Sequence, residues 1–288
     1  MTDISASMVA KLRKMSGQGM MDCKKALQDA EGDLDKAMEL LRKKGLATLA
    51  KRAGRETSEG IVIGKISDEG KAGILATLCC ETDFVAKSDD FVAAAELLSK
   101  YAFACPNDND INQLLETEID GKAFNNVITE TVSKTGEKTE VGDFVRFKVD
   151  SSGVINLYIH FNKKVGTMVE IETSDESLNA SESLRQAAND IAMHITATKP
   201  LALDKDGIDP ETIEREKAIY AEQVKGKPDN IIEKIVEGKM KKFYAENCLL
   251  QQPFVKDDTK TVEQVISEAA KQDGGEAKIK RFVRYELG

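Results

Sequence analysis

Hydrophobic positions in the N-terminal part of the chain recur every three or four residues, which is the spacing of short amphipathic helices. Two such segments, residues 5–14 and 20–29, are separated by a loop that contains glycine. A third segment, residues 34–44, ends in a run of cations and precedes Gly45, a combination typical of a helix C-terminus. The pattern therefore predicts three short helices packed as a small bundle, followed by a polar hinge or linker at residues 51–60.

The middle of the chain contains an internal repeat. Residues 60–104 and 153–197 each carry two strand-like runs joined by a turn, followed by an amphipathic helix. The offset between the copies is constant, and Gly73 of the first copy corresponds to Gly166 of the second. The matching apolar helix positions are Phe91, Ala94, Ala95 and Leu98, and Leu184, Ala187, Ala188 and Ile191. Each copy is therefore expected to be a β-hairpin covered by a helix, and a further strand at residues 144–149 precedes the second copy.

The C-terminal part begins with two strongly charged helical segments at residues 210–224 and 229–247. The connection between them is short and contains Gly and Pro, so we predict an antiparallel helical hairpin. An extended segment at residues 249–255, a helix at about 261–272 and a strand at 279–285 are expected to follow.

These elements predict an α+β fold with four parts. The helical bundle covers residues 1–54, and the first core subdomain covers residues 55–150. The second core subdomain combines residues 151–200 with 248–288, because the helical hairpin at 201–247 interrupts it.

Composition and charge narrow the class of protein. The chain has 288 residues, of which 41% are hydrophobic and 5% aromatic, and its formal net charge is −9. An acidic protein has no long-range field that attracts nucleic acid or an anionic membrane, so we expect neither as a direct partner. The composition also argues against disorder, a collagen-like chain and a disulfide scaffold, and no apolar run is long enough to predict a membrane span. Residues 1–3 lead directly into the first helical pattern without a signal or transit segment, so we expect a cytoplasmic protein.

The cysteine content indicates a reducing compartment, because the chain is long and has five cysteines, an odd number. Cys79 and Cys80 are adjacent on a predicted strand and would point to opposite faces, which disfavours a disulfide between them. Cys23, Cys105 and Cys248 lie among apolar residues and are expected to fill the core.

Motifs for catalysis and metal binding are scarce. The sequence has neither a phosphate-binding Walker loop nor a dinucleotide-binding glycine fingerprint. Its two histidines, His160 and His194, have no His or Cys partner at metal-ligand spacing. A segment that begins like a calcium loop at Asp108 fails, because Gln113 and Ile119 occupy the positions that require Gly and a carboxylate. The sequence therefore favours a protein-binding module over an enzyme and predicts no cofactor.

The junction between the second strand and the helix differs between the two copies of the repeat. The first copy has Thr82-Asp-Phe-Val85, whereas the second copy has Ser177 at the position of Phe84. The fold thus does not demand an aromatic residue there, and an acidic residue beside an aromatic one suits insertion into a partner's pocket. The alternative is that Phe84 turns inward and packs at the start of its own helix. Met20 and Met21 have the same two interpretations, adaptable partner contacts with Met20 the more exposed, or core packing.

Four short motifs are distributed along nearly the whole chain. They are Leu12-Arg13 followed by Gly17 to Leu27, Thr82 to Lys87, Glu237 to Phe243, and Gln252 to Lys256. Together they resemble the bacterial translation elongation factor Ts family. The resemblance implies a ubiquitin-associated-like N-terminal bundle, a core of two related subdomains, and an antiparallel coiled-coil hairpin.

The resemblance also implies a guanine-nucleotide exchange factor that binds elongation factor Tu in its GDP-bound and nucleotide-free states. In that family the motif formed here by Thr82, Asp83, Phe84 and Val85 enters the partner's GTPase domain and disturbs its magnesium site. Phe84 is then the expected wedge, and Asp83 is its polar companion. The other partner contacts that we expect are Met20, Met21, Lys24, His160 and Val236.

Three alternatives are retained alongside these expectations. His160 also has an interpretation as a turn or core residue, because the turn at residues 161–164 lacks the glycines common in the family. An RNA-binding translation accessory protein without exchange activity is one alternative function, which the acidic composition disfavours. A thiol enzyme built on Cys79 or Cys80 is the other.

Overall fold

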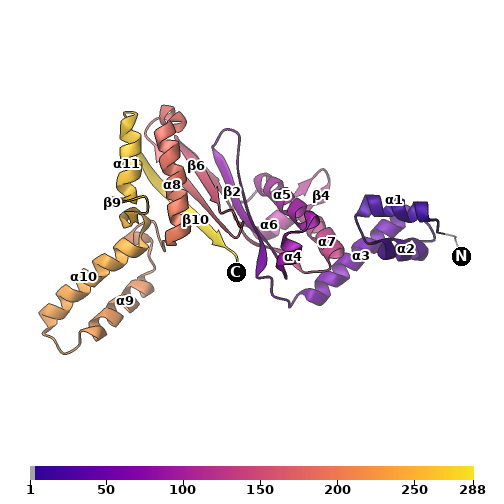
Figure 1. The fold of residues 1–288 in the computed structure, drawn as a ribbon, viewed down its shortest axis with the longest axis horizontal. Coiled ribbons are helices and arrows are strands. Elements are labelled where there is room, and N and C mark those ends of the chain that lie inside the picture. Colours follow the sequence, from indigo (N-terminus) through magenta and orange to yellow (C-terminus); the bar gives the residue numbers. More distant parts are fainter. Residues whose placement is uncertain (1–3) are drawn as a thin grey trace.

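The computed structural model describes residues 4–288, which form a molecule elongated along one axis (Figure 1). The N-terminal helices lie at one end, two sheets with their covering helices form the middle, and a pair of helices lies at the other end. The fold is α+β, as predicted, and the strands of both sheets are antiparallel. Among the helices described for residues 4–288, none has the length and hydrophobicity to cross a membrane. The prediction concerning residues 1–3 lies outside the described residues.

The N-terminal bundle consists of α1 (Ala6–Ser16), α2 (Met20–Asp29) and α3 (Leu34–Arg52). Ser5 caps α1, because its side chain accepts a hydrogen bond from the N–H of Met8. Gly17 ends the same helix in the left-handed conformation, with a φ of 68°. The bundle has a hydrophobic core of its own, made of Val9, Leu12, Cys23, Ala26, Leu27, Ala30, Ala37 and Leu41.

Helix α3 does not end at Gly45, contrary to the prediction, but continues to Arg52. An ideal Cβ on Gly45 would lie 2.7 Å from the carbonyl oxygen of Thr129 in α7 (Phe124–Thr135). The absence of a side chain thus lets α3 approach α7 closely, and this packing outweighs the helix propensity that glycine lacks, roughly 1 kcal/mol relative to alanine. The linker is consequently shorter than predicted, because α3 occupies its first residues and β1 (Glu59–Ile66) begins before its end.

Two three-stranded antiparallel sheets form the middle of the molecule, in the orders β1-β2-β5 and β10-β7-β6. Their remaining strands are β2 (Ala72–Cys80), β5 (Thr139–Lys148), β6 (Gly153–Ile159), β7 (Val165–Thr173) and β10 (Ala277–Glu286). The two hairpins of the repeat have the same register. Gly60 pairs with Cys79 in the first hairpin, and the corresponding residues Gly153 and Glu172 pair in the second. The predicted repeat is therefore confirmed.

The repeat extends further than the sequence predicted. Each hairpin is followed by a helix, α5 (Asp89–Ala104) or α8 (Glu182–Thr198), and the predicted apolar positions of both helices are buried. Each copy then continues with a second helix and a third strand, which are α7 and β5 in the first copy and α11 (Val262–Gln272) and β10 in the second. Between α5 and β5, the sequence analysis did not identify α6 (Ile111–Glu116), β3 (Glu118–Ile119), β4 (Lys122–Ala123) and α7.

The two sheets pack face to face through a shared hydrophobic cluster, whose buried members are Val62, Leu75, Phe147, Ile155 and Met168. Two equivalent glycines permit the close approach. A Cβ on Gly73 would lie 2.8 Å from Cγ2 of Ile155, and a Cβ on Gly166 would lie 2.7 Å from Cγ1 of Val62. Helices cover the outer faces, with α5 and α7 on the first sheet and α8 and α11 on the second (Figure 1).

The helical hairpin is formed by α9 (Pro210–Gln223) and α10 (Asp229–Asn247), as predicted, and it is inserted between α8 and α11. A small cluster at its base contains Ala202, Ile208, Met240, Phe243 and Cys248. The segment that was predicted to be extended instead begins with a short 3-10 helix, η3 (Leu249–Gln251). It continues into β8 (Pro253–Phe254), which pairs with β9 (Asp257–Thr261).

Candidate functional site

The junction after β2 forms a short turn, residues 82–87, which we call the Phe84 turn. Its centre is α4 (Asp83–Ala86), and the hydroxyl of Thr82 caps this helix by accepting the N–H of Val85 at 3.3 Å. Ala86 and Val85 pack against the first hydrophobic core, whereas Phe84 is 82% exposed. The interpretation in which Phe84 packs inward is therefore wrong, and its ring is accessible to a partner.

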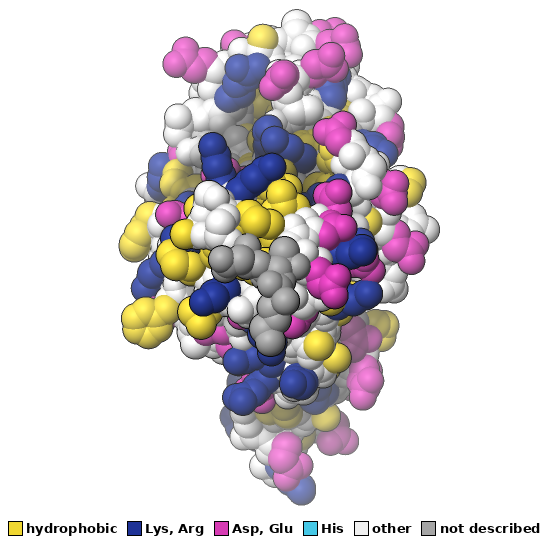
Figure 2. All heavy atoms as spheres, turned by 90° about the vertical axis from the view of Figure 1, so that its right-hand side faces the viewer, with side chains coloured by type: hydrophobic (Ala, Val, Ile, Leu, Met, Phe, Trp, Pro, Cys, Tyr) yellow, Lys and Arg dark blue, Asp and Glu magenta, His cyan; other side chains and the backbone are white. Residues whose placement is uncertain are grey.

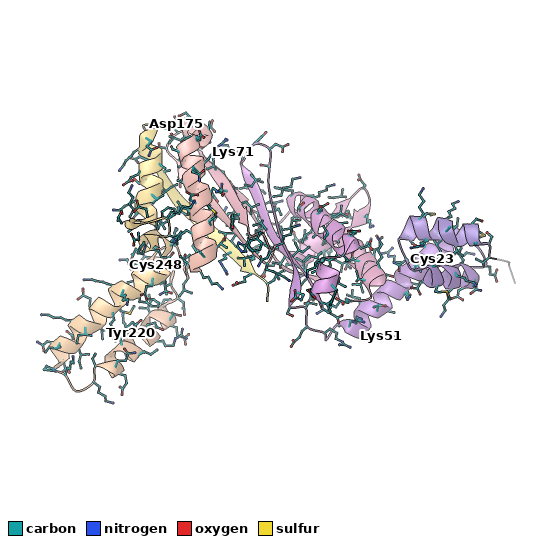
Figure 3. The ribbon with its side chains drawn as sticks, in the orientation of Figure 1. Cys23, Lys51, Lys71, Asp175, Tyr220 and Cys248 are labelled. Atoms are coloured by element: carbon teal, nitrogen blue, oxygen red, sulfur yellow. The ribbon has the colours of Figure 1, made fainter. Side chains whose placement is uncertain are left out.

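The corresponding junction in the second copy is also a short capped helical turn, but it is a 3-10 helix and lacks the aromatic residue. Asp175 caps the 3-10 helix η1 (Glu176–Ala180) by accepting the N–H of Ser177 at 2.7 Å. Leu178, which corresponds to Val85, is buried. Asp175 lies at the opposite edge of the molecule from α4 (Figure 3). Both turns thus pack an aliphatic residue against the core, fully buried in Leu178 and partly buried in Val85, whereas only the first copy has an exposed aromatic residue.

The Phe84 turn is anchored to the residues that precede β5. The carboxylate of Glu137 accepts hydrogen bonds from the N–H of Thr82 at 3.0 Å and from its hydroxyl at 2.8 Å. The carboxylate of Glu81 accepts the N–H of Lys138 at 2.7 Å and also binds the guanidinium of Arg52 at 2.7 Å. Burial by itself would raise the pKa of Glu81, but these two donors lower it below its ordinary value.

The turn that carries Phe84 also carries charged residues. Lys87 Nζ lies 2.7 Å from a carboxylate oxygen of Asp83, and this hydrogen bond lowers the pKa of Asp83 below its usual range. Lys164, from the turn between β6 and β7, lowers the same pKa by a smaller amount. Lys164 also forms an ion pair with Glu59 at the start of β1. The Phe84 turn therefore carries a paired negative and positive charge, and the second hairpin contributes a further cation near Asp83.

His160 lies in the turn between β6 and β7. Its Nδ1 is 3.2 Å from the hydroxyl of Tyr158, and its ring centroid is 4.4 Å from that of Phe161. Phe161 is 88% exposed, although the sequence analysis did not select it. The signal available in the sequence was an aromatic residue in an otherwise polar hairpin turn. This turn contacts the first sheet, because the N–H of Val62 donates to the carbonyl of Lys163 at 2.8 Å.

Met20, Met21 and Lys24 lie together on the N-terminal bundle. They line a groove of about 680 Å³ between α1 and α2, with Ile4, Ala6, Val9, Ala10, Arg13 and Lys14 on its other side. Met20 is 59% exposed and Met21 is 75% exposed, so core packing is wrong for both and Met21 is the more accessible. Figure 2 views the molecule from the end that carries the bundle, where hydrophobic side chains alternate with Lys and Arg. The groove is therefore apolar with a cationic rim.

Val236 is not close to these residues in the fold. It lies on α10, where it is half-buried and packs against the cluster at the base of the helical hairpin. The hairpin occupies the end of the molecule opposite to the bundle (Figure 1). The structure therefore places the expected contact residues on three surfaces, which are the bundle groove, the neighbouring Phe84 and His160 turns, and the hairpin.

Comparison with known sequences identifies the family. A family model described as "Elongation factor TS" matches residues 81–288. The chain belongs to the elongation factor Ts family. It is 46% identical to an elongation factor Ts of a Nitratiruptor species over 287 residues, which cover 99% of this chain and 93% of that protein. It is 43% identical to an elongation factor Ts of Clostridium botulinum over 288 residues, which cover 99% of this chain and 93% of that protein. The resemblance inferred from the motifs is thus confirmed, and the protein is a translation elongation factor.

The cysteines of this member of the elongation factor Ts family argue against a thiol enzyme. All five are free and buried, which confirms that Cys23, Cys105 and Cys248 fill the core and that Cys79 and Cys80 form no disulfide with each other. Burial raises the pKa of the Cys79 thiol and raises that of Cys80 to about 12. A thiol with a raised pKa is protonated at neutral pH and is a poor nucleophile. Within residues 4–288, no group of His, Cys, Asp and Glu side chains is arranged to hold a metal ion.

The structure gives the last elongation factor Ts motif, Gln252 to Lys256, a structural role. His194 is fully buried in α8, and its Nε2 lies 2.8 Å from the side-chain oxygen of Gln252. Its Nδ1 accepts the N–H of Val255 at 3.3 Å. Because Nδ1 accepts, Nε2 carries the proton, and the imidazole is neutral. Burial lowers the pKa of His194 below its ordinary value, which is consistent with this neutral state.

Proposed function

We propose that the protein is a guanine-nucleotide exchange factor, which binds elongation factor Tu in its GDP-bound and nucleotide-free states and promotes release of GDP. The observation that supports this most directly is Phe84, an aromatic residue 82% exposed at the tip of an anchored turn. Its counterpart in the second copy of the fold is Ser177, so the ring has no packing role that the fold requires. An exposed aromatic side chain on a rigid turn is suited to fill a pocket on another protein.

In the proposed mechanism the Phe84 turn enters the GTPase domain of the partner near its magnesium site. Mg²⁺ bridges the nucleotide phosphates and the protein in GTPases, and it neutralises their charge. A ring that displaces the groups around Mg²⁺ leaves the phosphates poorly neutralised, and GDP dissociates faster. The reciprocal relation between binding energies then requires that bound GDP weakens the affinity of the two proteins by the same factor. Asp83, with its pKa lowered by Lys87, remains a carboxylate beside the ring at neutral pH.

The other surfaces are assigned to binding and positioning. The N-terminal bundle, which we take to be ubiquitin-associated-like, docks on the partner through the groove of Met20, Met21 and Lys24. The turn of His160 and Phe161 provides a second contact, and Val236 marks a third on the coiled-coil hairpin. Because this function depends on binding and not on covalent chemistry, it needs no cofactor, and we assign it to the cytoplasm, where translation takes place.

Stopped-flow release of a fluorescent GDP analogue from elongation factor Tu tests the proposal. We expect Phe84→Ala to slow the maximal release rate by about tenfold or more, the effect of losing a central aromatic contact. Val255→Ala is the matched control, because Val255 is 53% exposed and is assigned to no contact surface. Equal release rates for Phe84→Ala and the unmodified protein would contradict the mechanism, as would an equal loss in the control.

An RNA-binding accessory protein is less well supported. Binding of RNA without base pairing relies on exposed aromatic residues beside unpaired cations. Phe84 and Phe161 are the aromatic residues among the strongly exposed hydrophobic side chains described, and the cation next to Phe84 is paired with Asp83. The net charge of −9 also opposes association with a polyanion.

A further inference from the structure

Two carboxylates hold together the strand-to-helix junction of the first copy and the segment that precedes β5. Glu81 lies on the junction, and Glu137 lies on the facing segment. Glu137 uses both of its oxygens to bind Thr82, one from the main-chain N–H and one from the hydroxyl, at 3.0 and 2.8 Å. These residues are 55 positions apart in the sequence. Hydrogen bonds to an ionised acceptor are roughly twice as strong as those between neutral groups, so this contact restrains the first residue of the Phe84 turn.

The second carboxylate completes the arrangement from the other side. Glu81 accepts the N–H of Lys138, the residue after Glu137, at 2.7 Å. Its two oxygens also bind the same guanidinium nitrogen of Arg52, at 2.7 and 2.8 Å. Arg52 is the last residue of α3, the helix that begins in the N-terminal bundle. Glu81, which directly precedes the Phe84 turn, thereby connects it to the segment after α7 and to the end of α3.

The second copy of the fold shows that the sheet does not need these carboxylates. Thr139 pairs with Cys80 in the first sheet, and the equivalent pair in the second is Ala277 with Thr173. Gly275 therefore stands where the first copy has Glu137, and Ser174 stands where it has Glu81. In place of the carboxylates, Ser174 Oγ accepts the N–H of Glu276 at 3.0 Å, and the N–H of Ser174 donates to the carbonyl of Glu276 at 2.9 Å.

The carboxylate pair thus occurs in the copy that carries the exposed aromatic residue and not in the copy that carries serine. We propose that Glu137 is a positioning residue for nucleotide exchange, which holds Thr82 and thereby fixes where Phe84 projects. Glu81 and Arg52 align α3 with the same turn. The inference rests on the proposed function, since it assigns Glu137 to the action of Phe84.

The effect of removing Glu137 follows from the remaining contacts of Thr82. Without the carboxylate, the Thr82 N–H loses its acceptor. Thr82 then keeps two hydrogen bonds to α4, from the N–H of Val85 to its hydroxyl at 3.3 Å and from the N–H of Ala86 to its carbonyl at 3.1 Å. Ala86 stays packed in the core, so the turn remains attached but samples more orientations. A ring that must enter a pocket then spends less time in the productive orientation, which lowers the maximal rate more than the affinity.

The test compares Glu137→Ala, Glu137→Asp and Glu137→Gln with Glu130→Ala. Glu130 is the matched control, because it lies on α7, is paired with Lys122 at 2.6 Å and does not contact the Phe84 turn. Glu137→Asp keeps the charge but shortens the side chain, so the test does not depend on the alanine variant being folded. The first readout is hydrogen exchange of the Thr82 amide by NMR. The second is the GDP-release assay over a range of factor concentrations, which separates the maximal rate from the half-saturating concentration.

We expect the Thr82 amide to exchange about tenfold faster in Glu137→Ala, and by a smaller factor in Glu137→Asp, with no change in Glu130→Ala. The maximal release rate falls by about fivefold in Glu137→Ala while the half-saturating concentration stays within about twofold. Glu137→Gln restores most of both, because its amide oxygen accepts the Thr82 N–H and its NH₂ group donates to the hydroxyl.

The two possible failures are distinguishable. Unchanged exchange of the Thr82 amide in Glu137→Ala and Glu137→Asp would overturn the positioning role, whatever the release rates. A higher half-saturating concentration with an unchanged maximal rate would also overturn it, because that result indicates a smaller folded fraction. If the Thr82 amide loses protection but Phe84→Ala releases GDP normally, the proposed function fails, and with it the link from Glu137 to exchange.

Discussion

Replacing Gly45 with alanine tests whether α3 is held against α7 by close backbone approach. In an exposed helix interior, Gly→Ala stabilises by roughly 1 kcal/mol, because alanine has the higher helix propensity. At Gly45 the added Cβ would lie 2.7 Å from the carbonyl oxygen of Thr129 and 3.0 Å from the Cβ of Ser133. A carbonyl oxygen within a helix cannot rotate away, so the helices must separate, and overpacking of this kind costs about 1–3 kcal/mol.

We expect the clash to exceed the gain in propensity, so Gly45→Ala lowers the free energy of unfolding by up to about 2 kcal/mol. Gly238→Ala is the matched control, because Gly238 lies inside α10 and its Cβ would meet no atom within 4 Å. That variant should gain roughly 1 kcal/mol. The same chemical change is thus expected to have opposite signs at two helical positions.

Differential scanning calorimetry measures the two effects. A change of 1 kcal/mol shifts the melting temperature of a protein of about 150–250 residues by about 2–4 °C, so the expected shifts are resolvable. Circular dichroism at about 222 nm measures helix content and checks that both variants keep their helices. A rise in melting temperature for Gly45→Ala equal to that for Gly238→Ala would refute the packing argument, since it would mean that α3 meets no obstruction at α7.

Three further predictions concern the buried groups. The folded pKa of His194 is lowered by burial, so the unfolded chain binds the extra proton first, and stability should fall as pH drops below about 6.5. Urea unfolding of the protein and of His194→Gln at pH 7.5 and 5.5, conditions on either side of that value, should show the smaller pH dependence in the variant. Gly166→Ala should destabilise by about 1–3 kcal/mol, because its Cβ would meet side chains of the facing sheet, and a thermal melt measures the loss. The five cysteines should react with Ellman's reagent in denaturant but not in the folded protein, because all are buried, and rapid labelling of Cys79 or Cys80 in the folded state would contradict this.

Much of the fold could be predicted from the hydrophobic periodicity and the internal repeat of the sequence. The duplicated hairpin was identified because apolar strand-like runs, turns and helix positions repeat at a constant offset, and the register of Gly60 with Cys79 matches that of Gly153 with Glu172. Helix α7 was missed because it is buried on more than one side and carries threonine within its core. Thr129 and Thr131 bond to carbonyls of their own helix, at 2.9 Å each, so polar residues occupy positions that an amphipathic pattern leaves apolar.

The residues of the candidate site also differ in how far the sequence could predict them. Phe84 could be selected from the sequence, because the second copy of the repeat supplies an internal comparison at Ser177. Its exposure could not be predicted, since a phenylalanine near a helix start packs inward or outward according to neighbours that are distant in the chain. Glu137 could not be selected at all, because its link to Thr82 spans 55 positions and depends on how β5 pairs with β2. Gly45 was misread for a similar reason, as the helix that accommodates it lies far along the chain.

Because α3 is one continuous helix, it holds the N-terminal bundle at a fixed distance from the Phe84 turn. The helix has 19 residues, so it spans about 28 Å from the bundle to Arg52, which binds next to the Phe84 turn. For a partner that contacts both the bundle groove and Phe84, docking at one surface sets a high effective concentration for the other, provided that its two sites match the separation that α3 maintains between them. A partner with mismatched sites gains no such advantage. The length of α3 therefore contributes to specificity, because partners are selected by the separation of their binding sites in addition to the chemistry of each site.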